Sequence, residues 1–277
     1  MTLVTIIIII IYICKKIIKM RIAVLYICTG RYNQFFNDFY KSAKKYFLNE
    51  IADIEYFVFT DNEHLCSNPD IHIIKKECNG FPLDSLMRFD DFLSIKDQLH
   101  CFDYTFFFNA NMKFVAPIGL EFIPIKEKLA AVIHPGYFHK PACLYPYERN
   151  KKSSAYIKPH EKGYHYFMGS LNGGKTEEYL KLIETCSKNI HKDMENGIIT
   201  KFHDESHLNK YLRNRTCLKY SPSYAYPEGK HIPFEKKIII TDKVKIDKYF
   251  EKGRSKTIIA IIRKAIVIIK ESINWYL

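Results

Sequence analysis

Short apolar runs alternate with amphipathic stretches along residues 21–108. The runs are bounded by turn residues, as buried strands are, and the stretches repeat apolar side chains every three or four residues, as packed helices do. The expected strands span 21–28, 54–60, 72–75 and 103–108, and the expected helices span 35–48 and 84–99. This order predicts an α/β domain with a central, mostly parallel sheet flanked by helices.

The pattern is less regular in the second half of the chain. Residues 129–133 and 164–167 are strand-like, and helices are expected over 176–191 and 203–213. Hydrophobic residues make up 47% of the chain and aromatic residues 15%, which excludes disorder for most of it. No repeat or low-complexity linker interrupts residues 21–245, so we interpret them as one domain.

The N-terminal segment, residues 1–20, is dominated by isoleucine. Its apolar part, residues 3–13, is too short to cross a bilayer, which takes about 20 residues. It also lacks the basic start and the cleavage site of a secretory signal. Either this segment is a weak anchor, or translation begins at Met20, where the first expected strand starts.

The C-terminal segment, residues 246–277, combines a charged hinge with an amphipathic helix. Isoleucines recur at helical spacing after Thr257 with basic residues between them, and Trp275 and Tyr276 close the run. A basic amphipathic helix with aromatic residues is typical of a helix that lies in a membrane surface. Docking of this helix on the body of the protein, or on another subunit, is the alternative.

The formal net charge of +12 is concentrated at the two ends of the chain. Residues 1–21 carry +4 and residues 243–277 carry +6, so the segment between them is nearly neutral. Because nucleic-acid-binding proteins carry their basic footprint on the folded body, this distribution argues against nucleic acid and favours a membrane surface. None of the 8 cysteines forms a CxxC pair, which fits reduced thiols in a cytosol. We expect a cytoplasmic protein, peripheral at the inner face of the membrane.

The densest polar cluster is His203-Asp204-Glu205-Ser206-His207, at the start of an expected helix. Its two histidines share a helical face, as in zinc metalloproteases, but the glutamate is one position late and no third ligand is evident. The adjacent carboxylates suit an N-terminal capping role. Alternatively, one of them faces a pocket and stabilises or attacks an oxocarbenium-like sugar transition state.

Asn109 and Asn111 directly follow the apolar run 103–108, and ligands of parallel sheets bind beyond the carboxyl ends of strands. Their spacing is similar to that of the DxD motif, which holds a divalent metal on a nucleotide diphosphate. Amide oxygens are neutral, so two of them without carboxylates bind Mg²⁺ or Mn²⁺ poorly. A turn or a helix cap would account for the same two residues.

Several short motifs follow one another through residues 21–245. They are 56–61 (YFVFTD), 109–111 (NAN), 134–136 (HPG), 147–149 (YER), 154–157 (SAYI), 173–174 (GG) and 203–212 (HDESHLNKYL). In this order they resemble the motifs of glycosyltransferase family six, the family of the ABO blood-group transferases and the α-1,3-galactosyltransferases. The stretch 203–212 is the most specific of them.

The resemblance implies a GT-A fold, the fold of many nucleotide-diphospho-sugar transferases. It also implies a retaining transfer of galactose or N-acetylgalactosamine from the UDP derivative. The acceptor would be the 3-hydroxyl of a β-galactoside, often next to fucose, which gives a blood-group-like glycan. The rival interpretation is a non-catalytic protein at the membrane that binds UDP or sugar and has lost its metal site.

The resemblance further implies roles for individual residues. Glu205 corresponds to the catalytic glutamate, either as nucleophile or as stabiliser of the oxocarbenium ion. The donor-side residues are Tyr26, Tyr32, Arg88, Asn109, Asn111, Met168, Ser170, Asp204 and Lys243. The acceptor-side residues are His134, Phe202 and again Glu205.

Two departures from the mammalian pattern bear on cofactor and donor. Asn109 and Asn111 occupy the two DxD positions, so we expect that no divalent metal is required, with Mn²⁺ as the alternative. Ser170 stands where a glycine would leave room for an acetamido group, which favours galactose over N-acetylgalactosamine as the transferred sugar. Phe202 replaces a tryptophan and still offers an apolar platform for a sugar.

Overall fold

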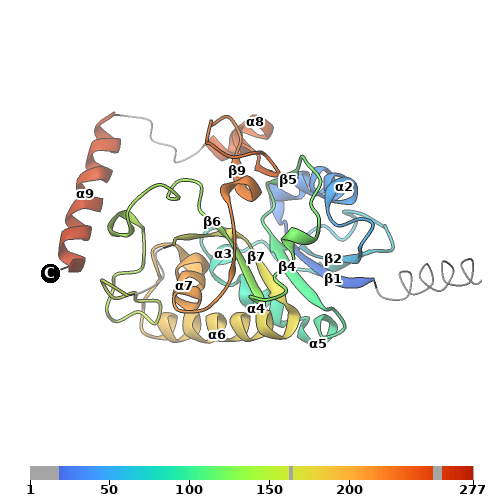
Figure 1. The fold of residues 1–277 in the computed structure, drawn as a ribbon, viewed down its shortest axis with the longest axis horizontal. Coiled ribbons are helices and arrows are strands. Elements are labelled where there is room, and N and C mark those ends of the chain that lie inside the picture. The colour runs from blue at the N-terminus through green and yellow to red at the C-terminus, as the bar shows by residue number, and fades with distance from the viewer. Residues whose placement is uncertain (1–18, 162–164, 252–257, 277) are drawn as a thin grey trace, which may run out of the picture.

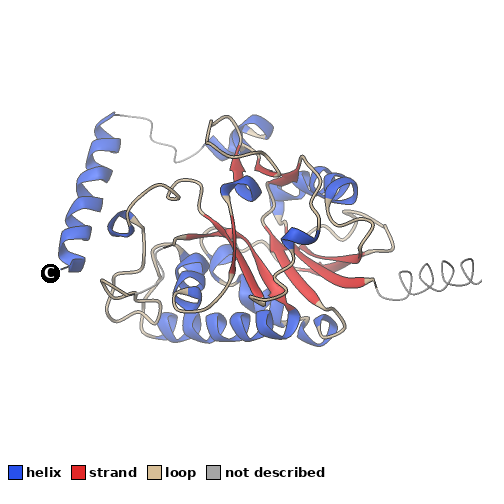
Figure 2. Cartoon of the chain, viewed as in Figure 1, coloured by secondary structure: helices blue, strands red, loops and turns tan. Residues whose placement is uncertain are grey.

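The computed structural model describes residues 19–161, 165–251 and 258–276, and for residues 258–265 it describes only the backbone (Figures 1 and 2). The apolar stretch expected at 3–13 lies outside these ranges. Among the described residues, no helix has both the length and the apolar character needed to cross a membrane.

A seven-stranded sheet forms the centre of the molecule, in the order β3-β2-β1-β4-β7-β6-β8. Its strands are β1 (Met20–Ile27), β2 (Ala52–Thr60), β3 (Ile71–Lys75), β4 (Tyr104–Phe108), β6 (Leu129–Ile133), β7 (Phe167–Lys175) and β8 (Leu218–Tyr220). All neighbouring pairs are parallel except the two that involve β7. The mixed, mostly parallel sheet confirms the expected α/β fold class, and it is consistent with a GT-A fold.

Helices cover both faces of this sheet (Figure 1). On β1, Ile22, Val24 and Tyr26 pack into the core under α2 (Phe36–Tyr46), whereas Ala23 and Leu25 pack into the opposite core. The helices of the second core are α4 (Arg88–Leu93), α6 (Thr176–Glu195) and α7 (His203–Leu212). Because both faces of β1 are buried, its sequence is a continuous apolar run rather than an alternating one.

Smaller elements complete the fold. The remaining helices are α3 (Leu83–Leu86), α5 (Lys96–Leu99), α8 (Lys243–Ile246) and α9 (Ile258–Tyr276), and a small sheet contains β5 (Met112–Phe114), β9 (Tyr226–Pro227) and β10 (Ile238–Ile240). Short 3₁₀ helices span Gly30–Phe35, Leu120–Phe122, Ala142–Leu144, Pro222–Ala225 and Lys248–Glu251. The single helix expected over 84–99 is therefore wrong, since three short helices occupy that stretch.

Strand β7 is much longer than the strand expected at 164–167. It continues through Gly173 and Gly174. Paired glycines are typical of turns, but here they belong to a strand inside the sheet. A side chain at Gly173 would place its Cβ 2.4 Å from the carbonyl oxygen of Thr105 on β4, so only glycine fits there.

The C-terminal helix α9 docks on the body by one face. The Trp275 indole nitrogen donates to the carbonyl of Ile157 (2.8 Å), and the Ser272 hydroxyl donates to that of Cys143 (2.7 Å). Trp275 is only 6% exposed, so its expected place as an interfacial membrane residue is wrong, and the docking alternative holds for this end of the helix. The outward side chains, which include Ile269 and Ile273, are more than half exposed.

Candidate active site

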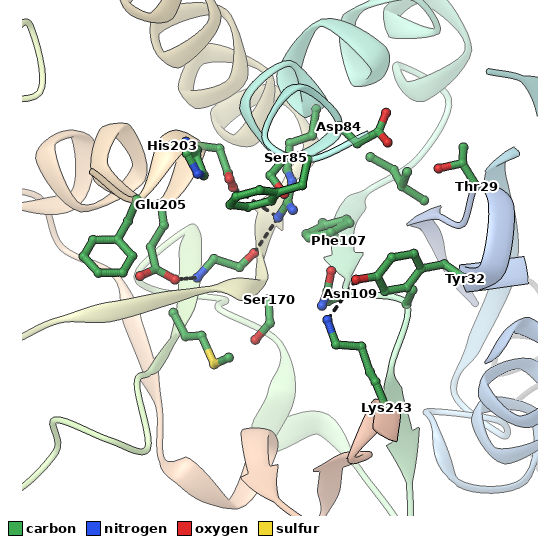
Figure 3. Close-up of a pocket in the computed structure, with 18 of the residues that line it drawn as sticks. Thr29, Tyr32, Asp84, Ser85, Phe107, Asn109, Ser170, His203, Glu205 and Lys243 are labelled. Carbon is green, nitrogen blue, oxygen red and sulfur yellow. Dashed lines mark hydrogen bonds and ion pairs between the residues drawn. The ribbon is translucent and has the colours of Figure 1, made fainter. Parts of the chain in front are cut away.

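A pocket of about 430 Å³ opens at the carboxyl ends of β1 and β4, between β7 and the start of α7 (Figure 3). Strand ends of this kind are where open α/β sheets bind ligands. Nine of the residues that sequence analysis singles out line it: Tyr32, Arg88, Asn109, Met168, Ser170, Phe202, Asp204, Glu205 and Lys243. The structure thus brings most of the predicted site together, from segments that are far apart in the sequence.

The carboxylate of Glu205 is held by two donors from outside its own helix. The backbone nitrogen of Gly169 donates to Oε2 (2.7 Å), and the hydroxyl of Tyr166 donates to Oε1. The first bond is drawn in Figure 3. A Cβ at Gly169 would lie 3.2 Å from a carboxylate oxygen of Asp204 and 3.3 Å from Cβ of Glu205, so a glycine allows this close approach. Glu205 is therefore fixed in the pocket rather than used to cap α7.

Asp204 forms a buried ion pair with Arg88 of α4. The distance between Nη1 of Arg88 and Oδ2 of Asp204 is 3.1 Å, and the same nitrogen donates to the carbonyl of Gly169 (3.0 Å). The guanidinium also lies over the ring of Phe107, 4.6 Å from its centroid. These contacts join α4, β4, β7 and α7 at one point of the pocket wall.

Burial raises the pKa of both carboxyl groups in the pocket. The pKa of Glu205 rises to about 7, because desolvation and the neighbouring Asp204 outweigh the hydrogen bonds from Tyr166 and Gly169. Desolvation also raises the pKa of Asp204, to about 6, against the opposing charge of Arg88. Carboxylates with pKa values shifted toward neutrality, in a pocket, are typical of functional sites.

An irregularity in the pairing of β6 with β7 shapes the middle of the pocket wall. The pairing of β6 with β7 jumps from Ala131–Asn172 to Val132–Met168, so residues 169–171 leave that ladder. Such bulges re-aim side chains next to active sites. Here the bulge turns Ser170 into the pocket, where its hydroxyl has no hydrogen-bond partner among the described residues.

The opposite end of the pocket is cationic and aromatic. The Lys243 ammonium donates to the hydroxyl of Tyr32 (2.8 Å), and Asn109 lies beside this pair (Figure 3). Lys243 also lies over the rings of Tyr32 and Phe250. A lysine and an aromatic ring therefore lie at one end of the pocket, and the two carboxylates lie with Arg88 at the other.

Comparison with known proteins agrees with this geometry. Residues 8–251 match the family model described as Glycosyltransferase family 6. The chain is 39% identical to the Escherichia coli O-antigen biosynthesis glycosyltransferase WbnI over 226 residues, which are 81% of this chain and 95% of the relative. The chain belongs to glycosyltransferase family 6.

Vertebrate relatives in the same comparison are more distant. The chain is 30% identical to the chicken globoside alpha-1,3-N-acetylgalactosaminyltransferase 1 over 86% of this chain and 70% of the relative. It is 37% identical to the rat histo-blood group ABO system transferase 2 over 47% of this chain and 38% of the relative. Family 6 membership makes the protein a glycosyltransferase, with a nucleotide-sugar donor and a glycan acceptor. Helix α9 lies beyond the part of the chain that matches the family.

The two asparagines at the DxD positions are bonded to each other and to the fold. Nδ2 of Asn109 donates to Oδ1 of Asn111 (2.9 Å), and Nδ2 of Asn111 donates to the carbonyl of Thr241 (2.9 Å). Asn111 is buried and does not line the pocket. No group of three His, Cys, Asp or Glu side chains that could hold a metal occurs among the described residues. This pair does not fit a divalent metal, because its oxygens are neutral and one of them already accepts a hydrogen bond.

Two other predicted residues lie outside the pocket lining. Tyr26 is fully buried in the core, where its hydroxyl donates to the carbonyl of Ala110 (2.6 Å), so it supports the pocket floor from below. The ring of His134 lies against Tyr137 and Tyr166, at 4.8 and 5.8 Å between centroids. Burial lowers the pKa of His134 to about 4, which keeps this histidine neutral at physiological pH.

The cluster 203–207 does not form a zinc site. His203 lines the pocket, with its ring 4.9 Å from that of the exposed Phe81, whereas His207 is buried 3.8 Å from Asp193 of α6. The two histidine rings therefore lie in different environments, one in the pocket and one in the core.

Two residues of the site are not predicted from the sequence: Tyr166, which donates to Glu205, and Lys201, which lines the pocket. Tyr166 is one of several aromatic residues in its segment, and nothing local marks its hydroxyl as a partner of a carboxylate 39 positions away. Lys201 directly precedes the Phe202 that was singled out, so its position was the available signal.

Proposed function

We propose that the protein is a retaining α-1,3-glycosyltransferase. It would move galactose or N-acetylgalactosamine from the UDP donor to the 3-hydroxyl of a β-galactoside, giving a blood-group-like glycan. The observation that carries this proposal is the buried Glu205 carboxylate, fixed by Gly169 and Tyr166 beside the Arg88–Asp204 pair. A negative group held in a pocket in this way stabilises an oxocarbenium-like centre.

The two ends of the pocket suit the two parts of a UDP-sugar. Lys243 and Arg88 supply positive charge for the diphosphate that leaves, and Tyr32 offers a ring to the uracil base. Asp204 would accept hydrogen bonds from hydroxyls of the donor sugar. Phe202, 37% exposed at the mouth, would receive the apolar face of the acceptor sugar. The retained configuration follows when Glu205 stabilises the cation while the acceptor attacks on the face that UDP leaves.

A non-catalytic sugar-binding protein is the rival proposal, and it rests on the two neutral asparagines at the DxD positions. An experiment separates the two. Each UDP-sugar is incubated with a panel of plain and fucosylated β-galactosides, and the glycosidic linkage of each product is determined by NMR. A new α-1,3 linkage with acceptor-dependent UDP release supports the transferase, whereas UDP binding without release supports the rival.

Transfer is expected to need no divalent metal. The diphosphate charge would be neutralised by Arg88 and Lys243, because the amides of Asn109 and Asn111 cannot supply the carboxylate ligands that Mn²⁺ requires. Rates measured with excess EDTA should match rates measured with Mn²⁺. Loss of transfer in EDTA and its return with Mn²⁺ would contradict the proposal.

Donor preference is expected to depend on Ser170. Its side chain lies in the pocket wall, where it would crowd an acetamido group at C2 of the donor sugar, and this favours UDP-galactose. Such a difference is worth about 1–3 kcal/mol. Ser170→Gly should shift the ratio of kcat/KM values toward UDP-N-acetylgalactosamine by about tenfold or more. An unchanged ratio in competition assays would remove the basis for the preference.

The outer face of α9 is proposed to rest on the cytoplasmic face of a membrane. Ile266, Ile269 and Ile273 are each more than half exposed there, and Lys270 lies among them. Replacing all three isoleucines with serine should weaken binding to anionic lipid vesicles by about tenfold or more. Ile125→Ser, at an isoleucine of the body that is even more exposed, should have no effect. Equal sedimentation of both variants with vesicles would count against the proposal.

A further inference from the structure

A second cleft, of about 280 Å³, lies between α9 and the body. Helix α9 contributes Glu271, Asn274 and Trp275, and the body contributes residues that include Arg149, Tyr156 and Lys201. Its volume lies just below the range for small-molecule sites, about 300–1,000 Å³, so it suits part of a ligand. The cleft exists only because α9 docks, and α9 lies beyond the family 6 match at residues 8–251.

The walls of this cleft are held in place by the contacts that dock the helix. The Arg149 guanidinium lies over the indole of Trp275 (4.9 Å) and donates to the carbonyls of Cys143 (2.8 Å) and Tyr145 (3.1 Å). The Trp275 indole is fixed in turn by its hydrogen bond to Ile157. A site whose walls are ordered before binding loses little entropy when a ligand enters.

The cleft adjoins the catalytic pocket through Lys201. This residue lines both cavities, and its ammonium pairs with Glu271 of α9 (2.6 Å). The next residue, Phe202, stands at the mouth of the catalytic pocket, on the side proposed for the acceptor. Lys201 is therefore a wall that the two cavities share.

Polar groups around the cleft remain available to a ligand. Among the described residues, neither the amide of Asn274 nor the hydroxyl of Tyr156 has a hydrogen-bond partner. Nε of Arg149 is buried and also lacks one. Five of the ten lining residues are charged, and together with the amides, hydroxyls and aromatic rings of the cleft they suit a polyhydroxylated ligand, because sugar hydroxyls both donate to carboxylates and accept from cationic N–H groups.

We infer that this cleft is an acceptor subsite, which binds the part of the glycan that extends beyond the acceptor galactose. The inference rests on the proposed function for the identity of the acceptor. It assigns α9 a role in acceptor length preference, so this enzyme should favour a longer glycan over a short one.

The test compares methyl β-galactoside with a tetrasaccharide that ends in β-galactose. Asn274→Phe fills the cleft, and Val267→Phe places the same side chain at an exposed position of α9 outside it. Because hydrogen bonds are worth about 1 kcal/mol each, Asn274→Phe should raise KM for the tetrasaccharide about five- to tenfold. KM for methyl β-galactoside, kcat with either acceptor, and all constants of Val267→Phe should stay unchanged.

The fluorescence of Trp275 can report on binding in the cleft, because this residue lines the cleft and is the single tryptophan of the sequence. Addition of the tetrasaccharide should change tryptophan emission in the wild type but not in Asn274→Phe, and methyl β-galactoside should change it in neither. Equal effects of Asn274→Phe on both acceptors, or emission that the tetrasaccharide leaves unchanged, would overturn the inference. A wild type that transfers to neither acceptor but shows the emission change would refute the proposed reaction and leave the glycan cleft standing.

Discussion

Glu205→Gln is expected to lower kcat at least about a hundredfold, with little change in the affinity for UDP. The substitution keeps the size and the acceptor oxygen that Gly169 or Tyr166 uses, but it removes the negative charge that the transition state needs. The measurement is steady-state kinetics with saturating donor, together with UDP binding by calorimetry. Loss of kcat without loss of binding is the signature of a group that acts on the transition state.

A matched control separates this role from helix capping. Glu177 also lies in the first turn of a helix, α6, but it is exposed and outside the pocket. A capping contribution is worth about 1 kcal/mol of stability, so Glu177→Gln should change Tm slightly and kcat not at all. If Glu205→Gln retains activity, Glu205 is structural and Asp204 becomes the candidate for the catalytic carboxylate.

The pH profile gives an independent check on Glu205. A carboxyl group ionises as the pH rises through its pKa, and the pKa of Glu205 in the free enzyme is about 7. Because the ionised form is the active one, kcat/KM should rise with pH across this range and fall below it. The pKa of Asp204 is close to that of Glu205, so the rise in the pH profile reports the ionisation of the two carboxyl groups together. A profile that stays flat down to about pH 5 would contradict this assignment.

The fold is largely predictable where one physical signal dominates. The apolar run of β1 alternates between two cores, so it predicts a strand buried on both faces, and such strands belong to parallel sheets covered by helices. Strand β7 could not be predicted in the same way. Its Gly173 is required by the backbone of Thr105 on the next strand, and that contact exists only after the sheet has formed.

The site is predictable to the extent that its residues share a motif. Asp204 and Glu205 are adjacent in sequence, so their pattern alone suggests paired chemistry. Their partners lie elsewhere: Arg88 was suggested by family resemblance, and Tyr166 was not suggested at all. Docking of the helix that carries Trp275 is only one of two alternatives from the sequence, since an amphipathic helix with a terminal tryptophan fits a membrane or a protein surface equally well. Periodicity shows which face of a helix is apolar but not what covers it.

Arg88→Met is expected to reduce both stability and catalysis. Arg88 is 8% exposed, and its removal leaves the buried Asp204 carboxylate without its ion-pair partner. Breaking a buried pair costs about 3–5 kcal/mol in the free energy of unfolding. We also expect kcat to fall at least about a hundredfold at temperatures where the variant is folded, because the leaving diphosphate loses a cation. Arg215→Met, at an exposed arginine, should change neither quantity appreciably.

A double variant separates the two roles of Arg88. In Arg88→Met combined with Asp204→Asn, the unpaired buried charge is gone, so Tm should recover much of what the single variant lost. The rate should not recover, since neither the cation for the diphosphate nor the carboxylate for the donor sugar is restored. If kcat returns together with Tm, Arg88 serves only to neutralise Asp204, and the positive charge for the leaving group must then come from Lys243, at the other end of the pocket.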